Sequence, residues 1–225
     1  MCIRDRATPQ WFISMESHGL RNKALKAIDN TDFYPSKGKE RIKSMIETRP
    51  DWCVSRQRVW GVPLPIFISK KTGEVLVDDE VFENIAKIYE KEGSDCWFNE
   101  DYQIFLGDKY KAEDYEKLSD IVEVWFDSGS THSFVLEKRD DLKWPASMYL
   151  EGSDQHRGWF HSSLLESCGT RGVAPFESIL SHGFVVDGKG LKMSKSTGNV
   201  IAPQDILKKY GADILRIWVA SSNYA

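Results

Sequence analysis

Short apolar segments that alternate with polar turns and helical patterns constrain this sequence more than any other feature. Three such segments have the composition of a buried strand, and a polar turn follows each one; they cover residues 121–126, 148–150 and 179–186. Helical patterns follow, and we expect helices over residues 156–167, 203–210 and 212–221. Strands that alternate with helices predict an α/β fold with a largely parallel sheet.

The first half of the chain predicts fewer elements. Apolar residues at helical spacing predict helices over residues 39–48 and 81–91, and two β-rich runs around a Lys-Thr-Gly-Glu turn predict a hairpin over 66–77. Residues 68–118 are more acidic and polar than their flanks, which indicates a small inserted α/β subdomain. Residues 7–67 and 119–225 then form one domain around it, and residues 1–6 stay unassigned.

The composition excludes several classes of protein. The chain has 225 residues, enough to bury a core without disulfide bonds. Its 30 Lys and Arg against 34 Asp and Glu give a net charge of −4, so the basic excess of a free-standing nucleic-acid-binding domain is missing. No apolar run approaches the roughly 20 residues of a membrane span, and no signal-peptide pattern opens the chain. We expect a globular, cytoplasmic protein with no membrane partner.

The residues that commonly bind metals form no site pattern. The four cysteines contain no C-x-x-C pair, and His156 and His161 are five apart, which does not place two ligands on one helix face. We therefore predict no structural metal.

The polar turns after the apolar segments are candidate sites, because parallel sheets collect their chemistry at the carboxyl ends of strands. The turns cover residues 127–130, 151–155 and 187–199. Each turn alone fits an ordinary loop and helix cap, since Asp, Ser and Gly are common in turns. Three of them together favour a site.

The third turn, a lysine loop over residues 187–199, has the clearest chemistry. Lys189, Lys192 and Lys195 against Asp187 leave a local charge of +2 inside an acidic protein. Mobile lysine ammonium groups suit a polyphosphate whose charge shifts during reaction, and neighbouring glycines and hydroxyls add flexibility and donors. The spacing is not that of a P-loop, and a solvated hairpin turn is the alternative. The residues predict an anion site.

The second turn offers hydrogen-bonding groups for a different part of a ligand. Glu151 and Asp154 can accept from ribose hydroxyls or an ammonium group, or can instead cap the following helix, where negative charge is favourable; Gln155 can donate and accept. Trp159 lies one turn beyond, and Trp125 follows another strand candidate. Two such tryptophans are more often core residues, but the polar loops beside them favour a pocket.

These same residues carry a family resemblance. Residues 192–196 match in full the K-M-S-K-S motif of class I aminoacyl-tRNA synthetases. The segments that resemble the isoleucyl-tRNA synthetase family in particular cover residues 52–63, 124–129 and 150–160. The resemblance extends from about residue 7 to the end of the chain, with its motifs in the family's order.

The resemblance implies a Rossmann-like nucleotide-binding domain, the C-terminal half of a class I synthetase catalytic core. It implies ATP-dependent activation of isoleucine to isoleucyl-adenylate and transfer to tRNA(Ile), with Mg²⁺ accompanying ATP, in a family that is usually monomeric. Lys192 and Lys195 would stabilise the charge on the leaving pyrophosphate. The implied ATP and adenylate contacts also include Glu151, Gly152, Asp154, His182, Gly183, Phe184, Met193, Ser194 and Ser196, and the implied amino-acid pocket is formed by Trp125, Gln155 and Trp159.

The sequence also departs from the family pattern. The H-I-G-H motif, the editing insertion, the anticodon-binding helices and the C-terminal zinc module are not found. We therefore expect an internal segment of a longer enzyme that is incomplete alone. Two alternatives stay open: a valyl- or leucyl-tRNA synthetase segment, and a non-catalytic nucleotide- or RNA-binding module.

Overall fold

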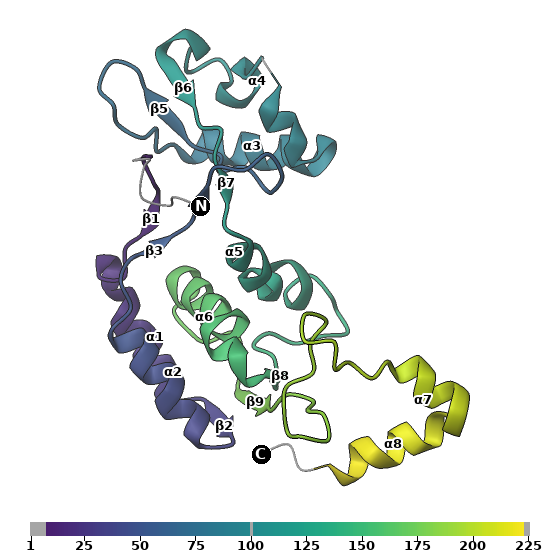
Figure 1. Ribbon diagram of the computed structural model, residues 1–225. Coiled ribbons are helices and arrows are strands. Elements are labelled where there is room, and N and C mark those ends of the chain that lie inside the picture. Colours follow the sequence, from purple (N-terminus) through teal and green to yellow (C-terminus); the bar gives the residue numbers. More distant parts are fainter. Residues whose placement is uncertain (1–7, 100, 223–225) are drawn as a thin grey trace. The chain divides into compact units, whose positions relative to one another are not determined.

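The computed structural model describes residues 8–99 and 101–222 and divides into two compact units (Figure 1). The first unit comprises the described residues of 8–19 and 49–130, and the second those of 20–48 and 131–222. Residues 20–48 therefore belong to a different unit from the segments that precede and follow them in the sequence. Each unit is described by itself.

The first unit combines short antiparallel strand pairs with short helices. The pairs are β1–β3, β4–β7 and β5–β6. Its elements in chain order are β1 (Phe12–Ile13), the 3-10 helix Ser17–Gly19, β3 (Trp52–Cys53), β4 (Ser55–Arg56), β5 (Phe67–Ser69), α3 (Asp79–Glu92), the 3-10 helix Ser94–Phe98, α4 (Gln103–Leu106), the 3-10 helix Ala112–Asp114, β6 (Tyr115–Lys117), β7 (Ile121–Val122) and α5 (Val124–Gly129).

An aromatic core lies within this unit, between residues 67 and 115. Trp97 is fully buried, and its ring centroid lies 5.0 Å from those of Phe67 and Phe105. The N–H group of the buried Trp97 indole has a hydrogen-bond partner, because Nε1–H donates to the carbonyl of Leu118 at 2.8 Å. Helix α3 covers this core with Val81 and Ile85, which are four residues apart and therefore share one helix face. The assignment of residues 68–118 to an inserted subdomain stays a prediction.

The predicted hairpin over residues 66–77 is confirmed, although its first strand has a further partner. Ser69 N–H donates to the carbonyl of Glu74 at 2.8 Å, and Ile68 forms an isolated bridge with Val75. The other edge of Phe67–Ser69 pairs with Tyr115–Lys117. The helix expected over residues 81–91 is α3, which starts two residues earlier, where Asp78 caps it.

The predicted strand over residues 121–126 is wrong beyond its second residue. Only Ile121–Val122 is a strand, and it pairs antiparallel with Ser55–Arg56 instead of joining a parallel sheet. Pairing ends at Glu123, whose N–H donates to Val54 O at 2.8 Å and whose buried carboxylate accepts from Trp52 Nε1–H at 3.2 Å. The chain then turns into α5, so the turn expected over residues 127–130 is largely helical.

The second unit contains a parallel sheet in the order β2-β9-β8. Its elements in chain order are α1 (Leu20–Asp29), β2 (Asp32–Tyr34), α2 (Lys37–Glu47), the π-helix His132–Leu136, β8 (Tyr149–Gly152), the 3-10 helix Ser153–Arg157, α6 (Trp159–Thr170), β9 (Ser178–His182), α7 (Pro203–Tyr210) and α8 (Ala212–Ser221). This parallel sheet with its helices confirms the predicted α/β class.

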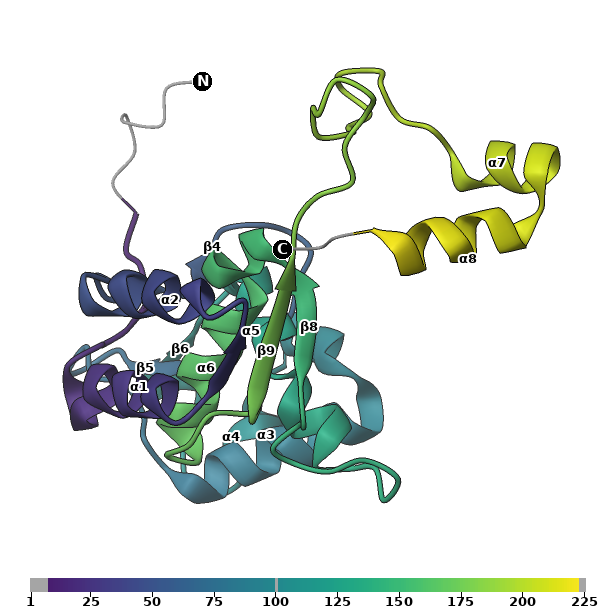
Figure 2. The same ribbon diagram turned by 90° about the horizontal axis from the view of Figure 1, so that it is seen from below.

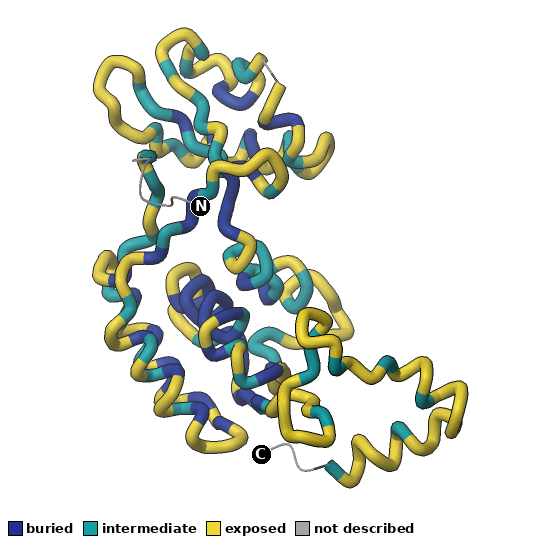
Figure 3. Tube along the Cα trace, viewed as in Figure 1, coloured by how far each residue is buried: buried dark blue, intermediate teal, exposed yellow. Residues whose placement is uncertain are grey.

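Helix α6 connects the two neighbouring parallel strands β8 and β9 and is the most buried helix of the unit (Figure 3). A parallel pair requires such a crossover, because its strands run in the same direction. Every residue of α6 from Phe160 to Cys168 is buried, and α1 packs on it through a small-residue face with Ala24 and Ala27. Helix α6 is therefore the buried crossover of this parallel pair.

The remaining boundaries mostly agree with expectation. Helices α7 and α8 have the predicted bounds, and α2 starts two residues before the helix expected over 39–48. Helix α6 starts at Trp159 and not at 156, because the preceding residues form a 3-10 turn that ends at Gly158. The strand expected over 179–186 ends at His182. In the part of the chain that the structure describes, no helix is long and apolar enough to cross a membrane.

The Asp78 carboxylate that caps α3 gives a first testable prediction. It accepts from Lys109 Nζ at 2.6 Å, from Tyr110 OH at 2.7 Å and from Glu80 N–H at 2.9 Å. The Lys109 and Tyr110 hydrogen bonds lower the pKa of Asp78 to about 2. Because this pKa lies below the ordinary value, the carboxylate stabilises the folded unit above about pH 4, and this stabilisation is lost as the pH falls toward 2.

Titration of the Asp78 carboxyl carbon by NMR measures this directly. We expect Lys109→Ala to move the midpoint upward toward the ordinary range, and the control Lys111→Ala, which removes an exposed ion pair with Glu113, to leave it in place. An ordinary midpoint in the unaltered chain would contradict the prediction.

Candidate functional site

The candidate site lies where β8 and β9 end, inside the second unit. The register of this parallel pair places Gly152, the last residue of β8, beside His182, the last residue of β9. Both strands then continue into polar segments, which are the 3-10 turn Ser153–Arg157 and the loop that leads to the lysines (Figure 2). The strand register therefore places the start of the second predicted turn beside His182, five residues before the third predicted turn.

Gly152 leaves room for the carboxylate of Asp154. A Cβ at position 152 would lie 2.7 Å from Asp154 Oδ1 and 3.9 Å from His182 Cε1. The backbone N–H of Gly152 donates to Glu151 Oε1 at 2.7 Å, so the Glu151 side chain folds back onto the strand end. The exposed carboxylates of Glu151 and Asp154 and the imidazole of His182 thus all lie close to Gly152.

The turn after β8 is held by its own side chains. Gln155 Oε1 accepts from the N–H of Trp159, the first residue of α6, at 2.9 Å. The sequence pattern indicated a capping role for the neighbouring carboxylates and not for Gln155. Trp159 stacks on Tyr149, with ring centroids 4.0 Å apart and planes 5° from parallel. The predicted contact of Gln155 and Trp159 with an amino acid stays a prediction.

His156 anchors this turn to the body of the unit. Its imidazole is 1% exposed, and Nδ1–H donates to the carbonyl of Ser153 at 2.8 Å. A Cβ at Gly38 of α2 would lie only 3.0 Å from His156 Nε2, so the ring packs directly on that helix. Burial lowers the pKa of His156, which keeps the ring neutral inside the unit.

The segment after β9 folds back on itself before it reaches the K-M-S-K-S motif. Val186 and Lys192 form an antiparallel bridge, Asp187 N–H donates to Leu191 O at 2.8 Å, and Met193 N–H donates to Val185 O at 3.1 Å. Gly190 has a φ of 75°, which a side chain would disfavour at the tip of this turn. The first part of the lysine loop, up to Met193, therefore belongs to a hairpin.

The two predicted catalytic lysines have different surroundings. Lys192 Nζ lies over the ring of Phe184, 3.5 Å from its centroid, and forms a cation–π contact. Lys195 is exposed on the next turn, where Ser194 Oγ lies 3.1 Å from Ser196 Oγ and 2.7 Å from Thr197 Oγ1. Both ammonium groups belong to an exposed, glycine-containing loop beyond the end of β9.

A cavity of about 940 Å³ opens at the same strand ends. Three residues predicted to contact adenosine, which are His182, Gly183 and Phe184, line it together with Leu150 and Leu180. Helix α8 closes another side with Trp218 and Val219. The volume falls within the range of roughly 300–1,000 Å³ that small-molecule sites occupy. Lys192 contacts Phe184, which is one of the residues that line this cavity.

Comparison with known proteins agrees with this geometry. The family model described as "tRNA synthetases class I (I, L, M and V)" matches residues 4–225. The chain belongs to the class I tRNA synthetases.

Two relatives of this class I synthetase chain are isoleucine–tRNA ligases. One, from Pelagibacter ubique, is 87% identical over 98% of this chain and 24% of its own length. Another, from Zymomonas mobilis, is 56% identical over 97% of this chain and 24% of its own length. The chain thus spans about a quarter of the length of these relatives.

Solved structures of other class I synthetases share the fold. The chain is 19% identical to Mycobacterium tuberculosis methionyl-tRNA synthetase in complex with methionyl-adenylate, with a TM-score of 0.58 over 93% of this chain and 33% of that one. It is 22% identical to the Agrobacterium radiobacter leucyl enzyme in a ternary complex with tRNA and LeuAMS, with a TM-score of 0.53 over 77% of this chain and 25% of that one.

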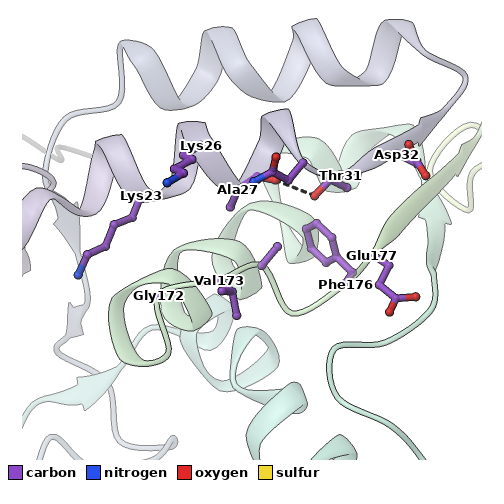
Figure 4. A pocket seen from close by; sticks show the side chains of 11 residues that line it. Lys23, Lys26, Ala27, Thr31, Asp32, Gly172, Val173, Phe176 and Glu177 are labelled. Carbon is purple, nitrogen blue, oxygen red and sulfur yellow. Dashed lines mark hydrogen bonds between the residues drawn. The ribbon is translucent and has the colours of Figure 1, made fainter.

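A second cavity of about 550 Å³ in this synthetase chain lies at the opposite, amino ends of β2 and β9 (Figure 4). Its charged lining consists of Lys23 and Lys26 from α1, with Asp32 and Glu177 beside the strand starts. These charges balance, and the cavity includes none of the predicted site residues. Among residues 8–99 and 101–222, no three Cys, His, Asp or Glu side chains gather into a possible metal site.

Sequence reasoning missed several residues that shape this candidate site. Tyr149 and His156 act through stacking and burial, and Asp187 and Asn199 through hydrogen bonds inside the lysine loop. Sequence analysis treated Asp187 only as a negative charge and Asn199 only as a residue of the lysine loop. Trp125 belongs to α5 of the first unit, so its role in the amino-acid pocket stays a prediction.

The space at Gly152 gives a second prediction. Gly152→Ala forces the Asp154 carboxylate to move, but that carboxylate is the free end of an exposed side chain, so the fold should tolerate the change. We expect the thermal unfolding midpoint to shift by less than about 2 °C, while the carboxyl signal of Asp154 shifts clearly in NMR spectra.

Gly169→Ala in α6 is the matched control. Its new Cβ meets Leu20 Cδ1 at an ordinary 3.7 Å, so the Asp154 signal should stay unchanged. An Asp154 signal that does not respond to Gly152→Ala would refute the proposed crowding.

Proposed function

We propose that this chain is the part of an isoleucine–tRNA ligase catalytic domain that carries the K-M-S-K-S loop. The observation that carries the proposal is the 87% identity to the Pelagibacter isoleucine–tRNA ligase over 98% of the chain. The intact lysine loop at the end of β9 supports an active ancestor over a non-catalytic binding module. The proposed setting is cytoplasmic, with isoleucine, ATP and tRNA(Ile) as substrates.

The proposed first reaction is the attack of the isoleucine carboxylate on the α-phosphorus of ATP. A bond forms between a carboxylate oxygen and that phosphorus, the bond to the β-phosphate bridging oxygen breaks, and pyrophosphate leaves with the electron pair. ATP enters with Mg²⁺ as its companion ion. The adenylate then transfers its isoleucyl group to the 3′ end of tRNA(Ile), which releases AMP.

The residues of this chain have separate roles in the proposal. Glu151, Gly152 and Asp154 hold the adenylate from the end of β8, and His182, Gly183 and Phe184 lie against its adenosine. Gln155, Trp125 and Trp159 contact the amino acid. Met193, Ser194 and Ser196 belong to the loop that closes over the phosphates. Lys192 and Lys195 stabilise the charge that develops on the leaving pyrophosphate, which favours the transition state over the bound substrate.

The test is a chimera in which this chain replaces the matching 220 residues of the Pelagibacter enzyme. Pyrophosphate exchange is measured with isoleucine, valine and leucine as substrates. We expect exchange to be fastest with isoleucine. Preference for valine or leucine would assign the chain to another member of the family, and no exchange with any of them would refute the proposed activity.

Lys195→Ala in that chimera is a third prediction. We expect kcat for isoleucine-dependent exchange to fall about 100- to 1,000-fold, the range for loss of one transition-state donor, with little change in KM for isoleucine. Lys208→Ala, which removes an exposed lysine of α7, is the matched control and should retain parental activity. A change confined to KM for isoleucine would contradict the assigned role.

A further inference from the structure

Asp187 and Asn199 lie at the two ends of the lysine loop and are joined side chain to side chain. Asn199 Nδ2–H donates to Asp187 Oδ2 at 2.9 Å, across twelve positions of sequence. Both residues are half-buried within a loop whose other residues are mostly exposed. The pair therefore closes the K-M-S-K-S segment into a ring.

The other carboxylate oxygen of Asp187 shapes the first turn of this ring. Oδ1 accepts from the N–H of Lys189 at 2.9 Å and from the N–H of Leu191 at 3.0 Å. The hydrogen bond from Asn199, and next those from the backbone, lower the pKa of Asp187, so the group is an anion at neutral pH. Asp187 thus accepts hydrogen bonds on both oxygens, two from the backbone on Oδ1 and one from Asn199 on Oδ2.

Asn199 holds the backbone on both sides of the motif methionine. Its Oδ1 accepts from the N–H of Ser194 at 3.0 Å, and its Nδ2 also donates to the carbonyl of Lys192 at 3.3 Å. The two catalytic lysines of the proposed function are Lys192 itself and Lys195, which follows Ser194. Asn199 thus uses its amide oxygen as an acceptor and its amide nitrogen as a donor.

We propose that Asp187 and Asn199 form a clasp that positions the backbone of Lys192 and Lys195 for the transition state. This inference rests on the proposed function for its catalytic consequence but not for its geometry. Gly188, Gly190 and Gly198 give the loop many alternative conformations, and each one misplaces the ammonium groups. The clasp removes most of these conformations before the substrate binds, so less ordering is needed during the reaction.

The polarity of the clasp permits an exchange test. Asp187→Asn places an NH₂ group opposite the NH₂ group of Asn199. The Asn199 amide cannot rotate to avoid this without losing its hydrogen bond from the Ser194 N–H. Asn199→Asp places two carboxylates together. The double variant D187N/N199D restores one donor facing one acceptor, while residue 187 still accepts from the two backbone N–H groups and residue 199 still accepts from Ser194. It lacks only the longer contact from residue 199 to the carbonyl of Lys192, at 3.3 Å.

The first measurement is amide hydrogen exchange by NMR on the 225-residue chain. We expect Asn199→Ala to speed exchange at Ser194 about tenfold, the factor for loss of one net hydrogen bond, and to raise the midpoint of the Asp187 carboxyl titration. Asp141→Asn, which breaks an exposed ion pair with Arg139, is the matched control and should change neither value. Unchanged exchange at Ser194 in Asn199→Ala would overturn the clasp.

The second measurement is pyrophosphate exchange in the chimera. Each single variant, Asp187→Asn and Asn199→Asp, should lower kcat about 100-fold, the cost of a misplacement of about 1 Å, with KM for isoleucine nearly unchanged. The double variant should recover most of the loss, which a merely destabilised protein would not do. Full activity of either single variant, or a double variant as slow as the singles, would overturn the positioning role. An inactive parent chimera would refute the proposed function, and amide exchange would then decide the clasp alone.

Discussion

The parallel pairing of β8 with β9 is the constraint on which the rest of the candidate site depends. Its register places Gly152 beside His182, so the two polar segments that follow start from neighbouring points. Helix α6, whose residues Phe160–Cys168 are all buried, forms the crossover between the two strands. Because a slip by one residue would turn the strand-end side chains to the opposite face, the packing of this crossover helix contributes to the arrangement at the strand ends.

Two kinds of structure meet at this edge, and their stability differs for a physical reason. The turn after β8 is tied to buried groups through Gln155, His156 and the Trp159–Tyr149 stack. The segment after β9 is held by hydrogen bonds between its own residues, and residues 183–186 and most of the lysine loop are exposed (Figure 3). Exposed hydrogen bonds contribute little net free energy, so the lysine loop can change conformation while the strand ends stay fixed.

Local signals determined which elements the sequence could predict. Pro203 and Gly211 act within one turn of chain, and both helices they delimit have the predicted bounds. β2 was missed because its three residues form a strand only through their distant pairing with β9. The segment 121–126 has the composition of a strand, but it has no partner after Glu123 and becomes helical. Composition and family resemblance identified the lysines, whereas the contact between Asp187 and Asn199 depends on a fold-back that no periodicity indicates.

The Lys192–Phe184 contact shows why such a loop suits a phosphate ligand. The ammonium group lies 3.5 Å from the centroid of a ring that is itself 43% exposed. A cation–π contact at an exposed site contributes about 0.5–1 kcal/mol. An exposed ion pair likewise contributes only about 0–1 kcal/mol. Neither kind of contact is strong, so Lys192 can exchange the ring of Phe184 for a nearby anion at small cost. The same competition lets the lysine return when the anion leaves.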